Sequence, residues 1–429
     1  MIAFAVGSWQ ISPQMLVVGA LTGLAYALLA SGLVLVYRAT RVINFAHGQV
    51  GAFAAALLAK VVLDWHWNFF IGLVGVLVVG GLVGAVVELG VVRRLFESPR
   101  LVLLVATIGV SQLLLLLEAV LPDVEASGRR YPTPIDASID IGSVHLGGEH
   151  LLLAIVAPVV IVAIGLFVNR SWHGVALRAA AENADRAELV GISTKRVSTM
   201  VWVLAGVLSA VTAVLLNPVR GTIVGAPDAA LGPGLLLRAL TAAMLGGLVS
   251  LPLALAGGIA VGLTEAVMFA NVSDPGSVDL VLFAVVLALV FGRRAMRNQE
   301  DAPWSLSPRA RPIPADLRDV GWVRRLPALT AVVCVAIAAV LPLVFTSSAR
   351  AYLFSTMVLF ALVGLSVTVL TGWAGQLSLG QFAFVGLGAT VCGALHDRGM
   401  PFAVAVAYAT TAGVLAALLI GFPALRARG

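Results

Sequence analysis

A charge-dense segment, residues 170–200, separates two long apolar runs and holds side chains that could engage a soluble partner. Residues 178–190 are strong helix formers, and the glycine that follows them stands where a helix would end. We expect a short surface helix here, which ends at Gly191. Two interpretations stay open on physical grounds: a docking element for a soluble protein, or an amphipathic connector on the lipid headgroups.

Polar side chains interrupt apolar runs at two places with the same local pattern. Glycine and other small residues surround both places, and such residues let helices approach closely in lipid. Polar groups within an apolar span are costly and tend to face a bundle interior or a pathway. The candidates for a translocation path are therefore Asn44, His47 and Gln49 in the first place, and Gln376, Ser378 and Gln381 in the second. The alternative is interhelical hydrogen bonding without solute contact.

Ionisable residues also stand within apolar runs. Glu88 and Glu118 are near run ends, where an interfacial position is expected. Glu265 lies deeper in its run, and we expect it to form a structural ion pair with Arg238 or Arg220. So few carboxylates do not indicate a proton-coupled carrier.

Motifs for catalysis and metal binding do not occur in the sequence. It contains no G-x-x-x-x-G-K-[ST] phosphate loop, no H-E-x-x-H, no Cys/His cluster and no nucleophile elbow. We expect no catalytic residue, no metal site and no cofactor bound by this chain, so that any ATP is used by separate subunits.

The composition indicates lipid as the solvent. The chain is 60% hydrophobic and only 11% charged, whereas soluble domains are about 45–50% apolar and about 25% charged. About thirteen apolar runs approach the roughly 20 residues that a membrane helix needs. The predicted fold class is all-α, a polytopic transmembrane helix bundle.

Basic residues gather in alternate connections between these runs. Arginines follow the runs that end near residues 37, 92, 168 and 292, whereas the connections near residues 64, 122–149 and 274–279 carry mainly acids. Basic loops belong on the cytoplasmic side. We therefore expect a multi-pass protein of the bacterial plasma (inner) membrane with an extracytoplasmic N-terminus. The net charge of +6 is read as a topology signal, and nucleic-acid binding is not expected.

The chain divides into two membrane units that share a repeat. Residues 1–292 form the first unit, residues 293–325 a proline-rich cytoplasmic linker and residues 326–429 the second unit. GLVLVYRATRVINFAHGQ at 32–49 matches GLSVTVLTGWAGQLSLGQ at 364–381 with an offset of 332. Because both copies have the same predicted orientation, the repeat is parallel. The second copy has no counterpart of residues 98–292, so we expect an incomplete second unit.

Three stretches carry a resemblance to a known family. The pattern R-A-x-A-E-N-x-x-x-A-x-L-V-G-I from Arg178 to Ile192 resembles the coupling segment of permeases in the branched-chain amino-acid ABC importer family. RVINFAHGQ at 41–49 looks like the signature of the LivH-type permease, and LTGWAGQLSLGQFAFVGLGA at 370–389 is similar to the LivM type. The resemblance implies a LivH-like unit joined to the front of a LivM-like unit, without the latter's own coupling segment.

The resemblance also implies partners and a solute class. In that family the coupling segment docks into a groove on the ATPase subunit. The resemblance implies that the coupling residues of this chain are Arg178, Ala181, Glu182, Asn183, Arg186, Leu189, Gly191 and Ile192. We therefore expect two cytoplasmic ABC ATPase subunits, an extracytoplasmic solute-binding protein, membrane lipid and a second permease subunit as partners. The expected solutes are branched-chain or other hydrophobic amino acids, or small neutral solutes such as urea and short amides.

Two other functions remain as alternatives. An ion- or proton-coupled secondary carrier would need no ATPase, but its usual marks are an inverted repeat and paired intramembrane charges. An inactive, truncated membrane fragment is the second alternative, because the second unit lacks a coupling segment.

Overall fold

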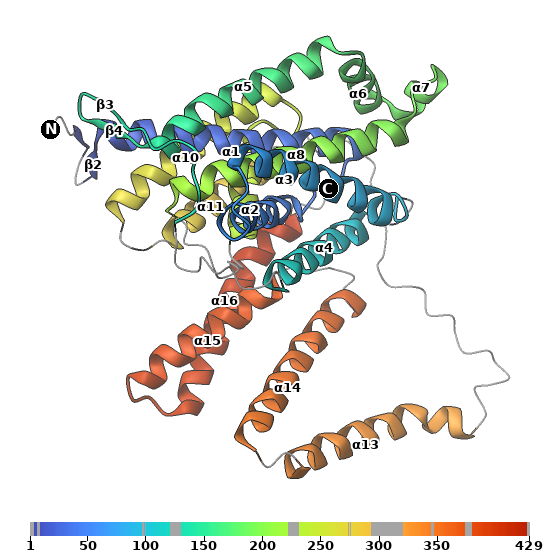
Figure 1. The fold of residues 1–429 in the computed structure, drawn as a ribbon. Helices are drawn as coiled ribbons and strands as arrows, with labels where there is room; N and C mark the ends of the chain where they lie inside the picture. The colour runs from blue at the N-terminus through green and yellow to red at the C-terminus, as the bar shows by residue number, and fades with distance from the viewer. Residues whose placement is uncertain are drawn as a thin grey trace. The chain divides into compact units, whose positions relative to one another are not determined.

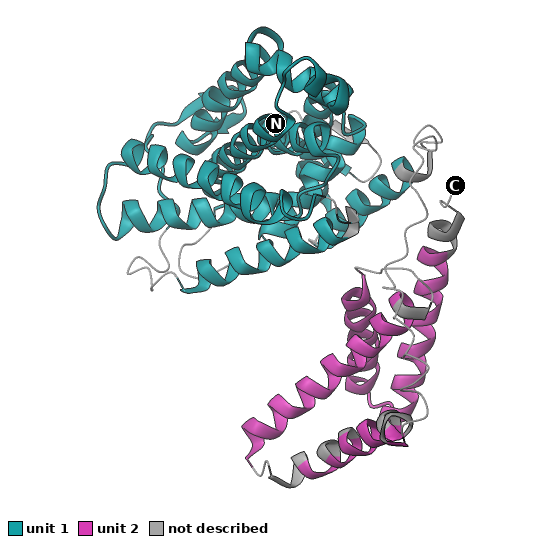
Figure 2. Ribbon diagram, turned by 90° about the vertical axis from the view of Figure 1, so that its right-hand side faces the viewer, with its two compact units in different colours: residues 1–293 teal, residues 294–429 magenta. Residues whose placement is uncertain are grey.

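Helices occupy the apolar runs that the sequence predicts. The structure, a computed structural model, describes residues 4–6, 9–96, 98, 100–120, 130–221, 231–272, 274, 276–292, 321–344, 347–373 and 380–426. Within these ranges each predicted run is mainly helical, because long stretches of apolar helix formers satisfy their backbone hydrogen bonds internally. The described chain is an all-α bundle with two small hairpins, and it divides into two compact units, residues 1–293 and 294–429 (Figure 2).

Unit 1 contains the longer series of elements. Its two antiparallel hairpins pair β1 (Phe4–Val6) with β2 (Trp9–Ile11) and β3 (Ile139–Ile141) with β4 (Val144–Leu146). Its helices are α1 (Pro13–Thr40), α2 (His47–Leu63), α3 (Phe69–Val87), the π-helical turn η1 (Glu88–Val92), α4 (Arg100–Val120), α5 (Gly148–Arg170), α6 (Trp172–Glu182), α7 (Ala184–Leu189), α8 (Thr194–Val219), α9 (Leu231–Leu245), α10 (Leu251–Asn271) and α11 (Gly276–Gly292).

Unit 2 is smaller and more open. Its elements are α13 (Gly321–Val344), α14 (Ser348–Thr368), the π-helical turn η3 (Val369–Trp373), α15 (Gln381–Asp397) and α16 (Phe402–Arg426). Most described side chains of this unit are exposed, and among them the buried apolar residues are Ala405 and Ala409.

Helix lengths separate full spans from short helices. Eight helices in the described residues are long and apolar enough to cross a membrane, whereas the helices at His47–Leu63, Leu231–Leu245 and Gly276–Leu289 are shorter. A helix of 17 or 15 residues is about 25 or 22 Å long, less than the roughly 30 Å of a hydrocarbon core. The crossing of the membrane by α2 and α9 as complete spans therefore stays a prediction.

The core of unit 1 is built around α1 and α8. Tyr26 of α1 and Trp202 of α8 are among the largest fully buried side chains. Glycines let α1 approach α10 closely: a Cβ on Gly23 would lie 2.6 Å from the Cα of Ile259, and one on Gly258 would lie 2.6 Å from Ala27. This small-residue contact is typical of helix pairs in lipid, where close van der Waals packing holds helices together.

The two hairpins and the α6–α7 corner lie at opposite ends of the long helices of unit 1 (Figure 1). The Gln14 amide donates to the backbone carbonyl of His145 at 2.8 Å, which ties the β3–β4 hairpin to the start of α1. The Asn271 amide donates to the Gln10 carbonyl at 3.0 Å, which ties the first hairpin to the end of α10. The bundle therefore has a hairpin end and an α6–α7 end, and the sequence topology predicts that the latter is cytoplasmic.

Candidate functional site

The charge-dense segment folds as two helices, which corrects the expectation of one helix ending at Gly191. Asn183 interrupts it with extended backbone, at φ −155° and ψ 108°. Its side-chain oxygen accepts from the Arg186 amide at 2.9 Å and so caps the start of α7. Asparagine competes well for such a capping position, and that local bond decides the break.

Gly191 ends α7 in the manner that the sequence predicts. Its φ is +86°, a conformation that glycine adopts without a steric penalty. The Gly191 amide donates to the Glu188 carbonyl at 3.0 Å, and the Ile192 amide donates to the Ala187 carbonyl at 2.9 Å. These bonds satisfy carbonyls at the helix end and direct the chain back into α8.

The α6–α7 corner presents both charge and apolar surface. Leu189 is 86% exposed and its neighbour Val190 is 75% exposed. Glu182 and Arg186 are also exposed, whereas Ala187 is buried and anchors α7 to the bundle. An apolar tip surrounded by charges is a suitable docking surface for a soluble protein.

Arginines from separate elements gather at this end of unit 1. Arg38 at the end of α1, Arg41 just after it and Arg178 of α6 are close enough to repel one another. The Arg41 guanidinium donates to the Ala181 carbonyl at 3.2 Å, and that of Arg178 donates to the Asn169 side chain at 3.3 Å. The fold thus concentrates positive charge at the end that carries α6 and α7, as cytoplasmic ends of membrane proteins do.

The first predicted path motif lies where the chain turns back into the bundle. Residues 42–44 are not helical, and α2 begins at His47, whose Nε2 lies 2.9 Å from the Leu29 carbonyl. Leu29 is eleven residues before the end of α1, or about 16 Å along its axis. The start of α2 is therefore deep within unit 1.

Side chains satisfy the backbone of this non-helical entry. The Asn44 oxygen accepts from the Ala46 amide at 3.0 Å, and the Thr107 hydroxyl of α4 accepts from the Phe45 amide at 3.2 Å. Such partners are needed because an unpaired backbone group inside a membrane protein costs several kcal/mol. Asn44 is buried and acts on the backbone of its own turn.

His47 and Gln49 are buried among neighbouring helices. The His47 carbonyl accepts from the Ser209 hydroxyl of α8, and the Gln49 amide donates to Glu118 of α4 at 2.9 Å. A Cβ on Gly48 would overlap the carbonyl of Gly232, where α9 begins. The structure thus brings Asn44, His47 and Gln49 to one place, where each makes hydrogen bonds within the bundle.

The second path motif is described only in part. Gln381 begins α15 and is half-buried. Gln376 and Ser378 lie outside the described residues.

A buried ion cluster joins α1, α8, α9 and α10. The Glu265 carboxylate accepts from the Tyr26 hydroxyl and from Arg238 Nε at 2.8 Å. Arg220 lies 3.8 Å from Glu265 and donates to the Tyr26 hydroxyl at 2.8 Å. Arg238 also pairs with Asp279 at 3.1 Å. Glu265 thus pairs with both arginines that the sequence offered as alternatives.

Sequence reasoning missed a cavity that the residues of this cluster help to line. It measures about 770 Å³ and is lined by residues of α1, α5, α8, α9 and α10. The ionisable residues Arg220, Arg238 and Glu265 were the part of its lining that the sequence signalled. Its walls come from positions far apart in the chain, such as Gln14, His150 and Phe269, and no local pattern connects them. Within the ranges that the structure describes, His, Cys, Asp and Glu form no group suited to a metal ion.

Comparison with known proteins identifies the family. The family described as "Branched-chain amino acid transport system / permease component" matches residues 15–291. The chain belongs to this permease family. The match covers the helices of unit 1 almost completely, and unit 2 lies outside it.

Individual relatives agree with the family. The chain is 32% identical to the high-affinity branched-chain amino acid transport system permease protein BraD of Pseudomonas aeruginosa over 292 residues, 65% of this chain and 93% of that relative. It is 31% identical to LivH of Escherichia coli over 286 residues, 63% of this chain and 90% of LivH. A probable LivH of Methanocaldococcus jannaschii is 26% identical over 269 residues, 61% of this chain and 83% of that protein.

A solved structure was also found, PsaBC from Streptococcus pneumoniae in complex with Fab. The match has 15% sequence identity and a TM-score of 0.37, and it covers 63% of this chain and 89% of the PsaBC chain. The family of unit 1 is shown by its sequence relatives.

Proposed function

We propose that this permease imports branched-chain or other hydrophobic amino acids, driven by ATP hydrolysis in two separate ABC ATPase subunits. The observation that carries the proposal is the α6–α7 corner, which a member of this family presents at its arginine-rich end. Urea and short amides are the alternative solutes. The mostly apolar spans suit neutral or zwitterionic solutes better than ions.

The α6–α7 corner is the proposed contact with the ATPase. Closure of two ATPase subunits would push on α7, whose exposed tip of Leu189 and Val190 fits an apolar groove. Exposed Glu182 and Arg186 would set the orientation of docking. Movement would pass into α8 through the bonds of the Gly191 turn and shift the bundle between two rigid arrangements.

The start of α2 is the proposed moving part of the solute path. Asn44, His47 and Gln49 position it deep in unit 1, and each makes a bond that a helix shift would exchange. A helix that begins inside a membrane protein directs free backbone N–H groups toward a passing solute. In unit 2 the matching proposal rests on Gln376, Ser378 and Gln381.

A second permease subunit is the proposed partner of unit 2. The offset of 332 relates α14, α15 and α16 to α1, α2 and α3. In unit 1, α3 packs against α8 through small residues: a Cβ on Gly80 would lie 2.9 Å from the Ala210 Cβ, and one on Gly84 would overlap the Trp202 carbonyl. The offset assigns Ala412 to Gly80 and Ala416 to Gly84, so small residues stand at both places in unit 2.

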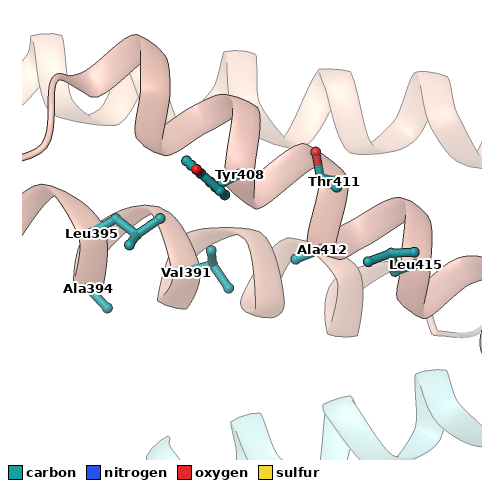
Figure 3. A pocket seen from close by; sticks show the side chains of 7 residues that line it. All are labelled: Val391, Ala394, Leu395, Tyr408, Thr411, Ala412 and Leu415. Carbon is teal, nitrogen blue, oxygen red and sulfur yellow. The ribbon is translucent and has the colours of Figure 1, made fainter.

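The corresponding face of unit 2 is open. A groove of about 370 Å³ runs between α15 and α16, with Tyr408, Ala412 and Leu415 on its walls (Figure 3). A Cβ on Gly413 would meet no atom within 4 Å. We propose that a helix of the α8 type, from a second membrane subunit, fills this groove. Ala412→Trp should then prevent co-purification of that subunit, whereas Leu419→Trp, at an exposed position outside the groove, should not.

The hairpin end of unit 1 is the proposed extracytoplasmic side. There a solute-binding protein would deliver the solute, and the N-terminus would lie on the same side of the bacterial inner membrane. The Gln14–His145 and Gln10–Asn271 bonds make this end a fixed surface for such a partner.

Photocrosslinking at Leu189 tests the coupling role. With benzoylphenylalanine at this position, the expected product is a covalent adduct with a protein that contains a G-x-x-x-x-G-K-[ST] loop, identified by mass spectrometry. The matched control is Leu166 of α5, which is 55% exposed on an apolar helix and should capture no such protein. Equal capture at both positions would refute docking at α7.

An ion-coupled secondary carrier is the weaker function. Family membership and the parallel repeat favour the importer. The bonds of Glu265 to Tyr26, Arg238 and Arg220 give its charge a structural role that needs no coupling ion.

A further inference from the structure

The cavity of about 770 Å³ near the hairpin end of unit 1 has the form of a ligand site. Its volume lies within the range of roughly 300–1,000 Å³ that small-molecule pockets occupy. Residues from five helices converge on it, so it is built by the tertiary fold. The path motif at the start of α2 is made by other residues, and the cavity is therefore a separate feature of the permease.

One end of the cavity holds its charged groups. The positive charge of Arg238 is compensated by two carboxylates, because it pairs with Glu265 at 2.7 Å and with Asp279 at 3.1 Å. Its side chain is only 8% exposed. Arg220 is held less tightly: it lies 3.8 Å from Glu265, and its side chain is 28% exposed. The cationic group that an entering ligand meets is consequently Arg220.

Two further polar residues line the cavity together with this cation. Arg220 Nη2 donates to the Tyr26 hydroxyl at 2.8 Å, and its guanidinium lies 5.9 Å from the Tyr26 ring centroid. His150 lines the same cavity, and its buried Nδ1 makes no hydrogen bond, although it lies 3.1 Å from a Glu149 oxygen. Tyr26 is therefore the polar group with a printed bond to Arg220, and His150 adds a titratable side chain to the lining.

The remaining wall is mainly apolar, with Gln14 and Thr22 as its uncharged polar residues. Met15 and Val18 of α1, Val219 of α8 and Phe269 of α10 face the cavity. A guanidinium binds a carboxylate through two parallel hydrogen bonds, and an apolar wall favours an apolar chain on the same molecule. The cavity therefore suits a molecule with an anionic head and an apolar body.

We propose that this cavity binds a small carboxylate with an apolar side chain, with its carboxylate on Arg220 and its side chain against Met15, Val18 and Phe269. Resting on the proposed function, the site would hold a hydrophobic amino acid before it enters the path. The same chemistry would also hold the anionic headgroup of a lipid, and the experiment separates the two sources.

The test measures binding of tritiated L-leucine to the full chain in nanodiscs of neutral phosphatidylcholine, by scintillation proximity and without ATPase subunits. We expect Arg220→Gln to weaken leucine binding about tenfold or more, as loss of a charged hydrogen-bond pair does. The affinity of Arg220→Lys for leucine should lie between those of the wild type and Arg220→Gln. Lysine keeps the positive charge but lacks the two parallel donors of a guanidinium. Arg130→Gln is the matched control, an exposed arginine that does not line the cavity.

A second variant guards against misfolding of Arg220→Gln. Ala270 is exposed at the cavity wall, so Ala270→Phe narrows the cavity and leaves the ion cluster intact. It should weaken leucine binding with an unchanged melting temperature. If leucine binds equally to all variants, the proposal for this cavity is wrong. The proposed transport function is tested separately, by the uptake of leucine in proteoliposomes.

The lipid source has its own arm. In nanodiscs that contain phosphatidylglycerol, native mass spectrometry counts the lipid retained by each variant. Retention by the wild type and loss in Arg220→Gln, without leucine binding, would assign the cavity to lipid and support its anion chemistry. If Arg220→Gln changes neither lipid retention nor leucine binding, the cavity is not an anion site.

Discussion

His47 Nε2 lies 2.9 Å from the backbone carbonyl of Leu29, in the middle of α1. This bond fixes the start of α2 deep inside unit 1. Gly32 makes the approach possible, because a Cβ at that position would lie 2.8 Å from the His47 ring. The non-helical entry to α2 therefore depends on a small residue one helix away.

Gly32→Val should displace the His47 ring and destabilise unit 1. Overpacking of a tight contact costs about 1–3 kcal/mol, so the melting temperature in detergent should fall. Gly109→Val is the control, because Gly109 has no neighbouring atom within 4 Å of its added Cβ. An equal loss for both variants would mean that the His47 contact is unimportant.

Gly191→Ala should weaken the coupling of ATP hydrolysis to uptake. The left-handed backbone at this residue costs a non-glycine roughly 1–2 kcal/mol, so the end of α7 should shift. Gly191→Asn should keep most of the coupling, because asparagine adopts this conformation more readily. The measurement is solute transported per ATP hydrolysed in proteoliposomes. Identical ratios for the wild type and Gly191→Ala would exclude a role for this turn.

Reversing the exposed charges of the α6–α7 corner should weaken docking of the ATPase. Glu182→Arg combined with Arg186→Glu should lower the affinity for the ATPase, because complementary charges orient such interfaces. The control reverses Asp140 and Arg130, both exposed residues of the polar stretch before α5. Binding can be followed by titrating purified ATPase onto the reconstituted permease. An unchanged affinity of the corner variant would contradict charge-guided docking.

Removing one partner of the buried ion cluster should destabilise the permease strongly. Arg238→Leu leaves Glu265 short of a cation, and a broken buried pair costs about 3–5 kcal/mol. Arg238→Leu combined with Glu265→Leu should recover part of that loss, since the buried carboxylate is then removed together with its closest cation. Arg220 and Asp279 each lose a partner in this variant, but both are more exposed than the removed pair. Thermal unfolding of the variants checks this result. A double variant less stable than Arg238→Leu alone would show that other contacts of these side chains dominate.

Labelling of single cysteines tests the orientation. In a background with Cys334 and Cys392 replaced by serine, Ser143→Cys in the β3–β4 turn should react with an impermeant maleimide on intact cells. Ser193→Cys, between α7 and α8, should react only after permeabilisation. The reverse pattern would place α7 outside and remove the basis for coupling.

Much of the helical fold was predictable because local composition determines it. Apolar runs of about 20 residues become helices whatever their neighbours, and Gly191 ends α7 because few residues tolerate its backbone. The break at Asn183 was missed because a capping bond competes with continued helix, and propensity alone does not decide between them. The pairing of Glu265 was foreseen in kind, since an intramembrane carboxylate needs a cation.

The deeper features depend on tertiary contacts that composition does not encode. The depth of α2 is set by bonds of His47 to α1 and of Gln49 to α4. The cavity at Arg220 arises because five helices meet around it, and its walls are separated by up to hundreds of residues. Small residues such as Gly23 and Gly258 were visible in the sequence, but which helices they join was not.

ATP-driven uptake of radiolabelled leucine is the most direct test of the importer function. Proteoliposomes would contain this permease with its ATPase subunits, its second permease subunit and its binding protein, with ATP enclosed on the side of α7. Leucine should accumulate only with hydrolysable ATP, and Leu189→Asp should abolish accumulation while the permease remains folded. Accumulation driven by an ion gradient without ATPase subunits would contradict the proposed function.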